Sequence, residues 1–470
     1  MPETTRDRFK IFLIIMLALC LRVISLNQSF WLDEATSGLV VRNLSFSEII
    51  NEFSPNDFHP PLYYLILKFW GVVFGFSEVA LRSLSVFLGL ASIYFTYKVA
   101  GVFGKKTGLL SAVFLALNGL HIYYSQEARM YIVSLFLVTL LMYLFLKILT
   151  SAEKRYWIYF SVVLILNAFT DYVPNFVIFS FWVFAALKQK RMNWWKKFVI
   201  VHVPLFVFMI LWMPFLLNQM KIASALKDEG SLWLGVLGGT NIKNILLVPV
   251  KFTFGRISFD NKYLYFMLSA FVLSVYSVII FKGKKLLEYK FFPLFLLWMV
   301  LPFVLIAIVS FQVSIFSYFR LIFILPAFLI ILAVSVINLP KKWRNLGIVF
   351  IIIVNTISSF YYLVTPKFHR ENWRSLVTHI RENSERNEYA VVFASGGQTE
   401  GYEYYDGSNK WVYKISQLKP DLKKLWYIRY VQDIFDPADM VVRNIESLNY
   451  HKTAILNFNG IVVWVYENSN

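Results

Sequence analysis

Long hydrophobic segments alternate with short polar stretches along most of the chain. Their length is close to the 17 to 25 residues of a helix that crosses a bilayer core of about 30 Å. The pattern therefore predicts a polytopic membrane protein with about eleven transmembrane helices. The predicted spans are residues 9–26, 80–100, 107–124, 130–149, 156–171, 174–188, 197–217, 262–281, 291–311, 320–337 and 344–364.

The apolar run 60–76 is short and carries Lys68, so it can be interpreted either as a span or as a helix at the membrane surface. If it does not cross, the basic loops all fall on the same side as the basic N-terminus, as the positive-inside rule requires. These loops are 105–106, 153–155, 188–197, 282–290 and 341–344. We therefore predict an interfacial helix at 60–76, with the N-terminus and residues 104–107 cytoplasmic.

This topology places the larger loops, 27–79 and 218–261, on the extracytoplasmic side together with everything after residue 364. No small-residue cleavage site follows the first hydrophobic segment, so we expect an uncleaved first span. Most of the unusual charged and polar residues gather on the same outer side: Asp33, Glu34, His59, Arg82, Gln126, Glu127, Arg129, Asp171 and Arg320.

The hydrophobic pattern changes after Val364. Apolar runs of strand length occur at 389–394, 453–458 and 461–466, and apolar positions between 372 and 383 follow helical spacing. We expect two domains: a mainly α transmembrane bundle over 1–364, and a small extracytoplasmic α/β domain over 365–470.

Composition agrees with a membrane protein and narrows the function. Hydrophobic residues make up 58% of the chain. The net charge of +18 lies mostly in short loops between apolar runs, which indicates membrane topology rather than nucleic-acid binding. The single cysteine, Cys20, excludes an intrachain disulfide. The sequence has no Walker loop, no G-x-G-x-x-G, no H-E-x-x-H and no D-x-D pair, which argues against a cytosolic nucleotide-driven enzyme.

Candidate chemistry begins at Phe30-Trp31-Leu32-Asp33-Glu34, just after the first span. Acidic side chains near hydrocarbon are costly and often functional, although these two could also be ordinary acids in a hydrated loop. His59 precedes two prolines that suit the first turn of a helix, so it could line a site or simply begin that helix.

Three arginines lie near the outer ends of spans: Arg82, Arg129 and Arg320. They could snorkel to the interface or bind a phosphate, for which the guanidinium fork is well shaped. Tyr131 could belong to an aromatic belt or stack on a sugar ring. Asp171, which interrupts an apolar run, could be a pocket residue or the end of a span.

The order and spacing of several motifs resemble the membrane-embedded GT-C glycosyltransferases. The resemblance is to the group of family 39 that contains protein O-mannosyltransferases and lipid A aminoarabinose transferases. It covers most of the chain, and the motifs that carry it are Phe30-Trp31-Leu32-Asp33-Glu34, His59-Pro60-Pro61-Leu62-Tyr63, Ala80-Leu81-Arg82-Ser83-Leu84-Ser85, Ser125-Gln126-Glu127-Ala128-Arg129-Met130-Tyr131, Tyr318-Phe319-Arg320 and Glu371-Asn372-Trp373-Arg374.

The resemblance implies a sugar donor carried on a polyprenyl phosphate and transfer outside the cytoplasm. It implies Asp33 as the catalytic base with Glu34 as its neighbour. The implied substrate-binding residues are His59, Tyr63, Arg82, Arg129, Tyr131, Asp171 and Arg320, with the arginines on the lipid phosphate. The acceptor would be a glycolipid, a cell-envelope glycan or a protein. The chain lacks the extra luminal domains of the eukaryotic mannosyltransferases, which weakens the case for a protein acceptor.

The expected chemistry needs few protein groups. A sugar on a phosphate has a good leaving group, so one carboxylate base and nearby cations suffice. No cofactor is firmly expected, and a divalent cation remains a candidate. The alternative function is a membrane transporter or lipid flippase, which would place polar groups near the bilayer midplane and show related halves.

Overall fold

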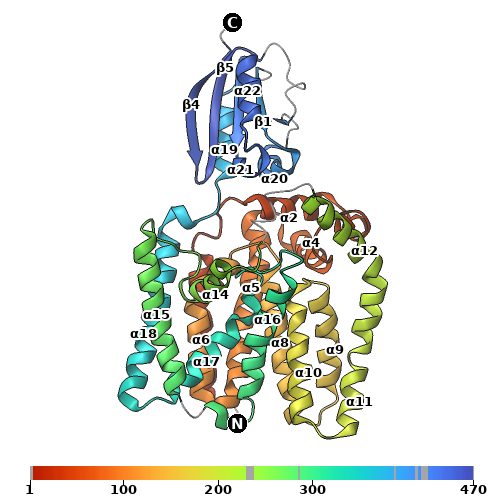
Figure 1. Cartoon of the computed structure of the whole chain (residues 1–470), viewed down its shortest axis with the longest axis vertical. Helices are drawn as coiled ribbons and strands as arrows, with labels where there is room; N and C mark the ends of the chain where they lie inside the picture. The colour runs from red at the N-terminus through yellow and green to blue at the C-terminus, as the bar shows by residue number, and fades with distance from the viewer. Residues whose placement is uncertain are drawn as a thin grey trace.

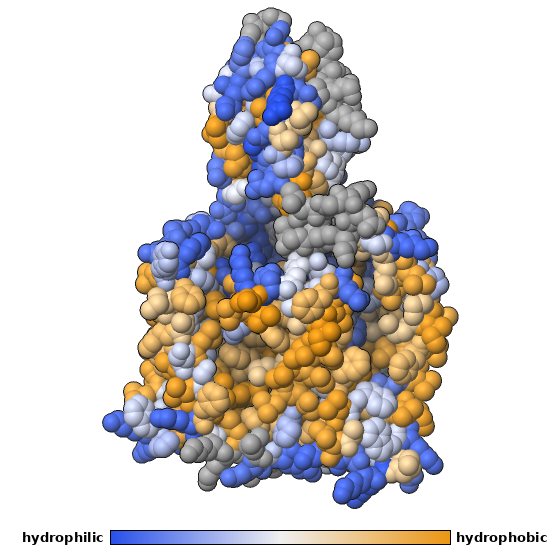
Figure 2. All heavy atoms as spheres, viewed as in Figure 1, coloured by the Kyte–Doolittle hydropathy of each residue, from blue (hydrophilic) through white to orange (hydrophobic). Residues whose placement is uncertain are grey.

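A bundle of long helices carries a small α/β domain at one end (Figure 1). The structure is a computed structural model that describes residues 4–228, 238–283, 286–385, 388–407, 411–413 and 422–468. The N-terminus lies at the end of the bundle opposite the α/β domain (Figure 1). Figure 2 shows a broad hydrophobic band across the visible face of the bundle and hydrophilic residues at both of its ends. This surface is the one expected of a protein surrounded by lipid.

Every predicted span coincides with one helix or with two consecutive helices. The bundle contains α1 (Thr5–Val23), α5 (Glu78–Ala100), α6 (Lys105–Leu117), α7 (Gly119–Ser125), α8 (Tyr131–Thr150), α9 (Arg155–Ala168), α10 (Val177–Lys188), α11 (Met192–Ile200), α12 (Val203–Asp228), α15 (Lys262–Lys282), α16 (Phe292–Val309), α17 (Leu325–Ile337) and α18 (Lys341–Val364). By length and composition, six helical segments of the described chain could cross a membrane, or seven if the bent pair α6–α7 counts as one span.

Shorter helices lie at the end of the bundle that faces the α/β domain: α2 (Leu32–Asn43), α3 (Phe46–Glu48), α4 (Leu62–Phe74) and α14 (Ile242–Phe254). Helix α4, the segment predicted to be interfacial, packs against α2 and α5. The Lys68 ammonium on α4 donates a hydrogen bond to the Val41 carbonyl at 3.1 Å. Its charge is thus placed at the end of the bundle and not in its middle.

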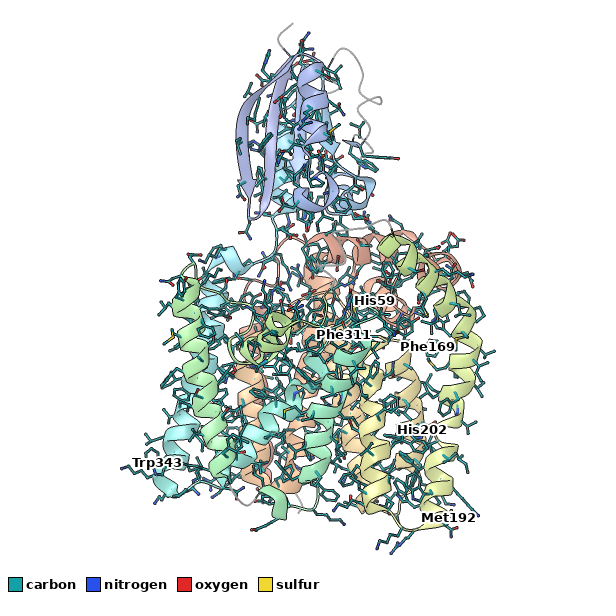
Figure 3. The ribbon with its side chains drawn as sticks, viewed as in Figure 1. His59, Phe169, Met192, His202, Phe311 and Trp343 are labelled. Carbon is teal, nitrogen blue, oxygen red and sulfur yellow. The ribbon has the colours of Figure 1, made fainter. Side chains whose placement is uncertain are left out.

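Basic loops gather at the opposite end of the bundle. Lys105 at the start of α6 forms an ion pair with Asp7 near the N-terminus, with 3.0 Å between Nζ and Oδ2. Met192 and Trp343 mark the same end in Figure 3, whereas His59 lies near the end that carries the α/β domain. The charge asymmetry used to predict the topology is therefore present in three dimensions.

The C-terminal domain has a five-stranded mixed sheet in the order β2-β1-β3-β5-β4. Strand β1 is parallel to β2 and β3, and β5 is antiparallel to β3 and β4. The domain consists of α19 (Trp373–Glu382), β1 (Tyr389–Phe393), α20 (Glu400–Asp406), β2 (Trp411–Val412), β3 (Lys424–Arg429), α21 (Gln432–Phe435), α22 (Met440–Ser447), β4 (Tyr450–Phe458) and β5 (Ile461–Asn468). The predicted α/β class, the helix and three of the strands are confirmed.

The C-terminal domain shares a hydrophobic core with the loop that follows α1. Leu32 is buried in the same cluster as Trp373 of α19 and Tyr402 of α20, and Trp31 packs against that cluster. The ring of Tyr404 lies against Phe30, with 5.0 Å between ring centroids. The domain is therefore docked directly on the first turn of α2.

Candidate active site

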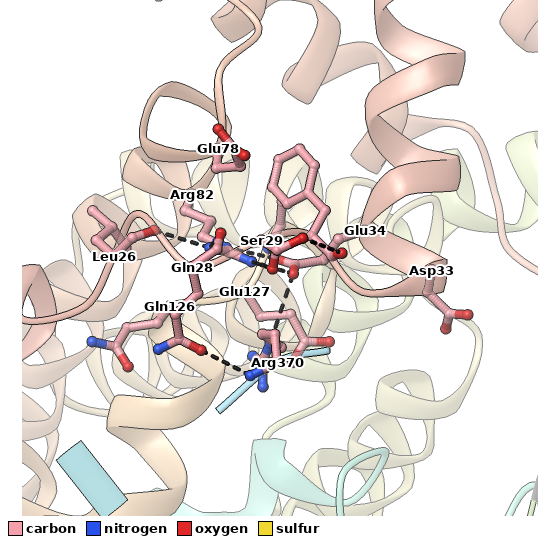
Figure 4. Close-up of polar contacts among 12 residues, drawn as sticks. Leu26, Gln28, Ser29, Asp33, Glu34, Glu78, Arg82, Gln126, Glu127 and Arg370 are labelled. Carbon is pink, nitrogen blue, oxygen red and sulfur yellow. Dashed lines mark hydrogen bonds and ion pairs between the residues drawn. The ribbon is translucent and has the colours of Figure 1, made fainter. Parts of the chain in front are cut away.

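The five residues of the first motif point in three directions from the start of α2. Phe30 is buried beneath the docked domain, and Trp31 and Leu32 enter the core of that domain. Glu34 points into the helical bundle, whereas Asp33 points away from it to the side (Figure 4). The two adjacent carboxylates, which the sequence alone could not distinguish, therefore lie in different environments.

Glu34 belongs to a buried ion pair with Arg82 of α5. Arg82 Nε donates to Glu34 Oε1 at 2.8 Å, and its Nη2 donates to Oε2. The backbone N–H of Ala128 also donates to Glu34 Oε1, at 2.7 Å. Glu34 is completely buried and both of its oxygens already accept bonds from the protein, so it is positioned to hold structural elements together and not to meet a substrate.

Arg82 uses all five of its N–H donors within the protein. The two that bind Glu34 leave three, which reach the carbonyl oxygens of Leu26, Gln28 and Ser29. Arg82 thus fixes the loop that leads into α2 (Figure 4). This is a different role from the phosphate contact expected from the sequence, and we do not propose Arg82 as a phosphate ligand.

Asp33 is about one-third exposed and lies in the first turn of α2, where the helix dipole favours a negative charge. Its Oδ2 lies 3.6 Å from Nη2 of Arg129. Arg129 is 6% exposed and also donates to Ser37 Oγ at 3.2 Å. Asp33 is therefore the carboxylate that a substrate can reach, with a cation beside it.

A break between α6 and α7 positions the loop that carries Arg129. The two helices meet at 63°, and the buried guanidinium of Arg22 on α1 donates to the carbonyl of Ala116 at 3.1 Å. Arg22 also contacts Nδ1 of His121 at 2.6 Å. Because this arginine satisfies backbone groups freed by the break, α7 can turn and direct residues 126–130 toward α2.

Arg370, in the linker between α18 and α19, enters the same region from the C-terminal side. Its Nη2 donates to Oε2 of Glu127 at 2.8 Å, and its Nε lies 3.6 Å from Oε2 of Glu34. The guanidinium lies over the ring of Tyr123 at 3.6 Å. Burial lowers the pKa of Arg370 to about 9, and the Glu34 charge partly offsets this effect. Arg370 therefore links both buried carboxylates to the docked domain.

His59 and Tyr63 lie on the loop and the first turn that lead into α4. Burial, assisted by the positive charges of Arg129 and Arg320, holds the pKa of His59 well below its ordinary value, so the imidazole is neutral. Tyr63 is completely buried. The neighbouring Tyr64 donates to Asp57 at 2.9 Å and lies 3.5 Å from Nη1 of Arg129. The two predicted residues thus lie beside the Asp33–Arg129 pair.

Tyr131, Asp171 and Arg320 border the same region. Tyr131 lies between the rings of Tyr124 and Phe319, with centroid distances of 5.3 and 5.4 Å. Asp171 follows the end of α9, and its burial raises its pKa to about 6. The positive charges of Arg129 and Arg320 lower the pKa of Asp171, as they lower the pKa of His59. The structure therefore brings all the predicted residues except Glu34 and Arg82 to one region around Asp33.

Several residues at the site escaped the sequence interpretation. Arg256 stacks on the ring of Tyr123 at 4.9 Å and donates to the Tyr318 hydroxyl. Arg370 and Asp57 were also missed. Arg256 and Arg370 are further arginines on the predicted outer side, so the argument used for the first three arginines could have found them.

The described side chains do not form a metal site built by the protein alone. Within the described residues, no three His, Cys, Asp or Glu side chains converge as metal ligands do. Glu34 is bound by Arg82, and Asp33 is paired with Arg129. We therefore assign no step of the reaction to a metal ion.

The chain resembles known membrane glycosyltransferases in part of its sequence and in its fold. The family model of dolichyl-phosphate-mannose-protein mannosyltransferases matches residues 58–217. The crystal structure of ArnT from Cupriavidus metallidurans bound to undecaprenyl phosphate has a TM-score of 0.61 at 11% identity and covers 97% of both chains. No curated protein is similar enough to count as a relative.

The oligosaccharyltransferase AglB from Archaeoglobus fulgidus is also similar in fold. Its complex with an inhibitory peptide and a dolichol-phosphate has a TM-score of 0.54 at 13% identity, covering 99% of this chain and 74% of that one. Its complex with zinc and sulfate has a TM-score of 0.52 at 13% identity, covering 98% and 73%. Together, the matches confirm the resemblance drawn from the sequence motifs. The chain therefore has the fold of these membrane-embedded transferases, and part of its sequence matches the mannosyltransferase family model.

Proposed function

We propose that this GT-C type membrane protein moves a sugar from a polyprenyl-phosphate donor to a hydroxyl group of an extracytoplasmic acceptor. The acceptor class is a glycolipid, a cell-envelope glycan or a protein. The observation that carries the proposal is the position of Asp33, a reachable carboxylate beside buried and half-buried cations at the end of the bundle. The undecaprenyl phosphate bound to ArnT and the dolichol-phosphate bound to AglB support a lipid-linked donor.

In the proposed reaction, the acceptor oxygen forms a bond to the anomeric carbon while the bond from that carbon to the phosphate oxygen breaks. Asp33 takes the proton of the acceptor hydroxyl as general base. The electron pair of the broken bond stays on the polyprenyl phosphate. Arg129, Arg320 and Arg256 are the cations placed to stabilise the charge that develops there.

Glu34 and Arg82 support this reaction without touching the substrates. Their buried pair fixes the entry to α2, and the bond from Ala128 to Glu34 fixes the loop that carries Arg129. The Glu34–Arg82 pair therefore positions both Asp33 and Arg129. Site residues must be held to within about half an ångström by supporting contacts, and Glu34 and Arg82 provide such support.

The decisive test is Asp33→Asn in transfer assays with a panel of undecaprenyl-phosphate sugars in detergent or lipid. Asparagine is nearly isosteric but cannot accept the proton, so we expect transfer to fall roughly 10²- to 10⁴-fold. Thermal stability and affinity for undecaprenyl phosphate should stay close to wild type. Wild-type turnover by a folded Asp33→Asn protein would refute the assignment.

Glu34→Gln is the matched control, because it changes the adjacent carboxylate in the same way. It removes the charge that compensates the buried Arg82, so it should lower the thermal stability as well as the activity. A stable Glu34→Gln protein without activity, beside an active Asp33→Asn protein, would move the base to Glu34.

A further inference from the structure

Four buried side chains near Asp33 carry polar atoms that have no hydrogen-bond partner among the described residues. The atoms are the Tyr63 hydroxyl, Glu127 Oε1, Arg129 Nε and two nitrogens of Arg370, Nε and Nη1. The exposed fractions of these residues are 0, 2, 6 and 6%. Buried polar atoms are almost always paired, so a group of unpaired ones indicates a ligand or bound water.

The four side chains come from three separate parts of the chain that meet at α2. Glu127 and Arg129 flank Ala128 in the sequence, and the Ala128 N–H donates to Glu34 at 2.7 Å, so both residues belong to the segment that adjoins that carboxylate. Arg370 pairs with Glu127 at 2.8 Å. Tyr63 adjoins Tyr64, which contacts Arg129 at 3.5 Å. The ring of Tyr63 lies against that of Tyr64, with 5.5 Å between ring centroids, so Tyr63 lies in the same region as Arg129.

The chemistry of this cluster fits a neutral polyol. The set contains both donors and an acceptor, and two of its members, Glu127 and Arg370, neutralise each other at 2.8 Å. An anion or cation bound between these two would therefore have to break their ion pair. Aromatic rings of Tyr63, Tyr124 and Tyr131 lie nearby, and an apolar ring face suits the C–H face of a sugar.

We propose that Glu127 and Arg370, together with Tyr63, bind hydroxyl groups of the donor's sugar, so that the linker to the C-terminal domain takes part in sugar selection. This inference rests on the proposed function, since the sugar must sit between the phosphate-binding arginines and Asp33. The backbone N–H of Arg370 donates to Gln28 Oε1 at 2.9 Å, and its carbonyl accepts from Asn459 at 2.8 Å. The linker is thus fastened both to the loop before α2 and to the docked domain, which fixes where the Arg370 side chain lies.

The test compares Glu127→Gln and Arg370→Lys with wild type on undecaprenyl-phosphate sugars that differ at single hydroxyl groups. The readout is the ratio of kcat/KM values between donors. Loss of one hydrogen bond to a charged group should change that ratio roughly 10- to 100-fold for the donor whose hydroxyl is contacted. Affinity for undecaprenyl phosphate, which carries no sugar, should change less than about twofold.

The matched control is Arg374→Lys, which lies on the same segment but pairs with Glu78 at 2.6 Å and is half exposed. It should leave the donor ratio unchanged. If both test variants lower activity equally for all donors, their role is structural and the inference is wrong. If wild-type protein neither transfers any sugar of the panel nor binds undecaprenyl phosphate, the proposed function fails instead.

Discussion

At the scale of single residues, burial separates side chains that look equivalent in the sequence. Arg82 is completely enclosed and all its donors are used, whereas Arg320 is half buried and one of its nitrogen atoms donates to the Ser314 carbonyl at 2.9 Å. Asp33 and Glu34 also differ in burial: Asp33 is about one-third exposed, whereas Glu34 is completely enclosed. A charged group that is fully paired inside the protein is costly to leave unpaired, whereas one with free donors or acceptors is available to a ligand.

We predict that Arg82→Lys lowers the stability of the protein, whereas Arg320→Lys weakens its binding of undecaprenyl phosphate. Lysine keeps the charge but loses the planar fork. Arg82→Lys should lower the free energy of unfolding, by about 3–5 kcal/mol if the pair with Glu34 is broken. Arg320→Lys should keep the stability and weaken binding of undecaprenyl phosphate. Thermal melts measure the stability, and lipid-binding titrations measure the affinity for undecaprenyl phosphate. If Arg82→Lys reduced the lipid affinity without lowering the stability, the structural role of Arg82 would be contradicted.

Asp171 gives a prediction with a defined pH window. Burial raises its pKa from the ordinary value of 3.8 to about 6, so the folded protein holds a proton that the unfolded chain loses between those values. The carboxyl therefore destabilises the fold increasingly as pH rises from about 4 to 6, and most above that window. Asp171→Asn should stabilise the protein at pH 8, by up to about 3 kcal/mol, and hardly at all at pH 4.

Melting curves of both proteins at the two pH values check this prediction. The amide can still accept the bond that Asp171 Oδ1 receives from the Val173 N–H at 3.2 Å, so no contact is lost. An equal stability difference at pH 4 and pH 8 would mean that the carboxyl does not titrate as described.

At the scale of elements, close packing between α2 and α20 holds the C-terminal domain over the site. A Cβ at Gly38 of α2 would lie 2.7 Å from a ring carbon of Tyr404 on α20. The Tyr404 hydroxyl donates to the Phe76 carbonyl, and Arg42 lies over its ring at 4.7 Å. Because these contacts fix the ring, the tyrosine cannot move aside without losing them.

Gly38→Ala should therefore loosen the docking of the C-terminal domain. Overpacking of this kind costs about 1–3 kcal/mol, and the linker should become easier to cleave by protease. Gly101→Ala is the control, since no atom lies within 4 Å of the added methyl and the backbone there is helical. A Gly38→Ala protein as resistant as the control would show that the α2–α20 contact does not hold the domain.

At the scale of the whole molecule, the charge distribution relates the fold to the membrane. Basic loops lie at the end that carries the N-terminus, and the site and the C-terminal domain lie at the other end. The positive-inside rule then predicts that the site lies outside the cytoplasm. A lipid-linked donor and an extracytoplasmic acceptor would meet at that end.

Cysteine labelling tests this orientation. In a background without Cys20, an impermeant maleimide added to intact cells should label Ser447→Cys, on the exposed side of α22, but not Lys106→Cys. Both should react after permeabilisation, which controls for reactivity. Labelling of residue 106 in intact cells would overturn the predicted topology.

The sequence by itself determined the features that depend on local pattern. Hydrophobic length predicted each long helix, and apolar runs of strand length predicted strands β1, β4 and β5, because such runs mark segments that are buried along their length. Strands β2 and β3 were not predicted: β2 has only two residues, and the apolar run of β3 is short because Lys424 and Arg429 stand at its two ends. The resemblance favoured Asp33 over Glu34, and the exposure of Asp33 supports that preference.

Tertiary structure decided which charged groups meet. Arg82 pairs with a residue 48 positions away, and Arg370 pairs with one 243 positions away. No local pattern encodes such pairs, because they form only when several helices and the linker converge on α2. The sequence could therefore place Arg82, Arg129 and Arg320 on one side of the membrane. Only the packed structure separates the arginine that supports the fold from those that face the substrate region.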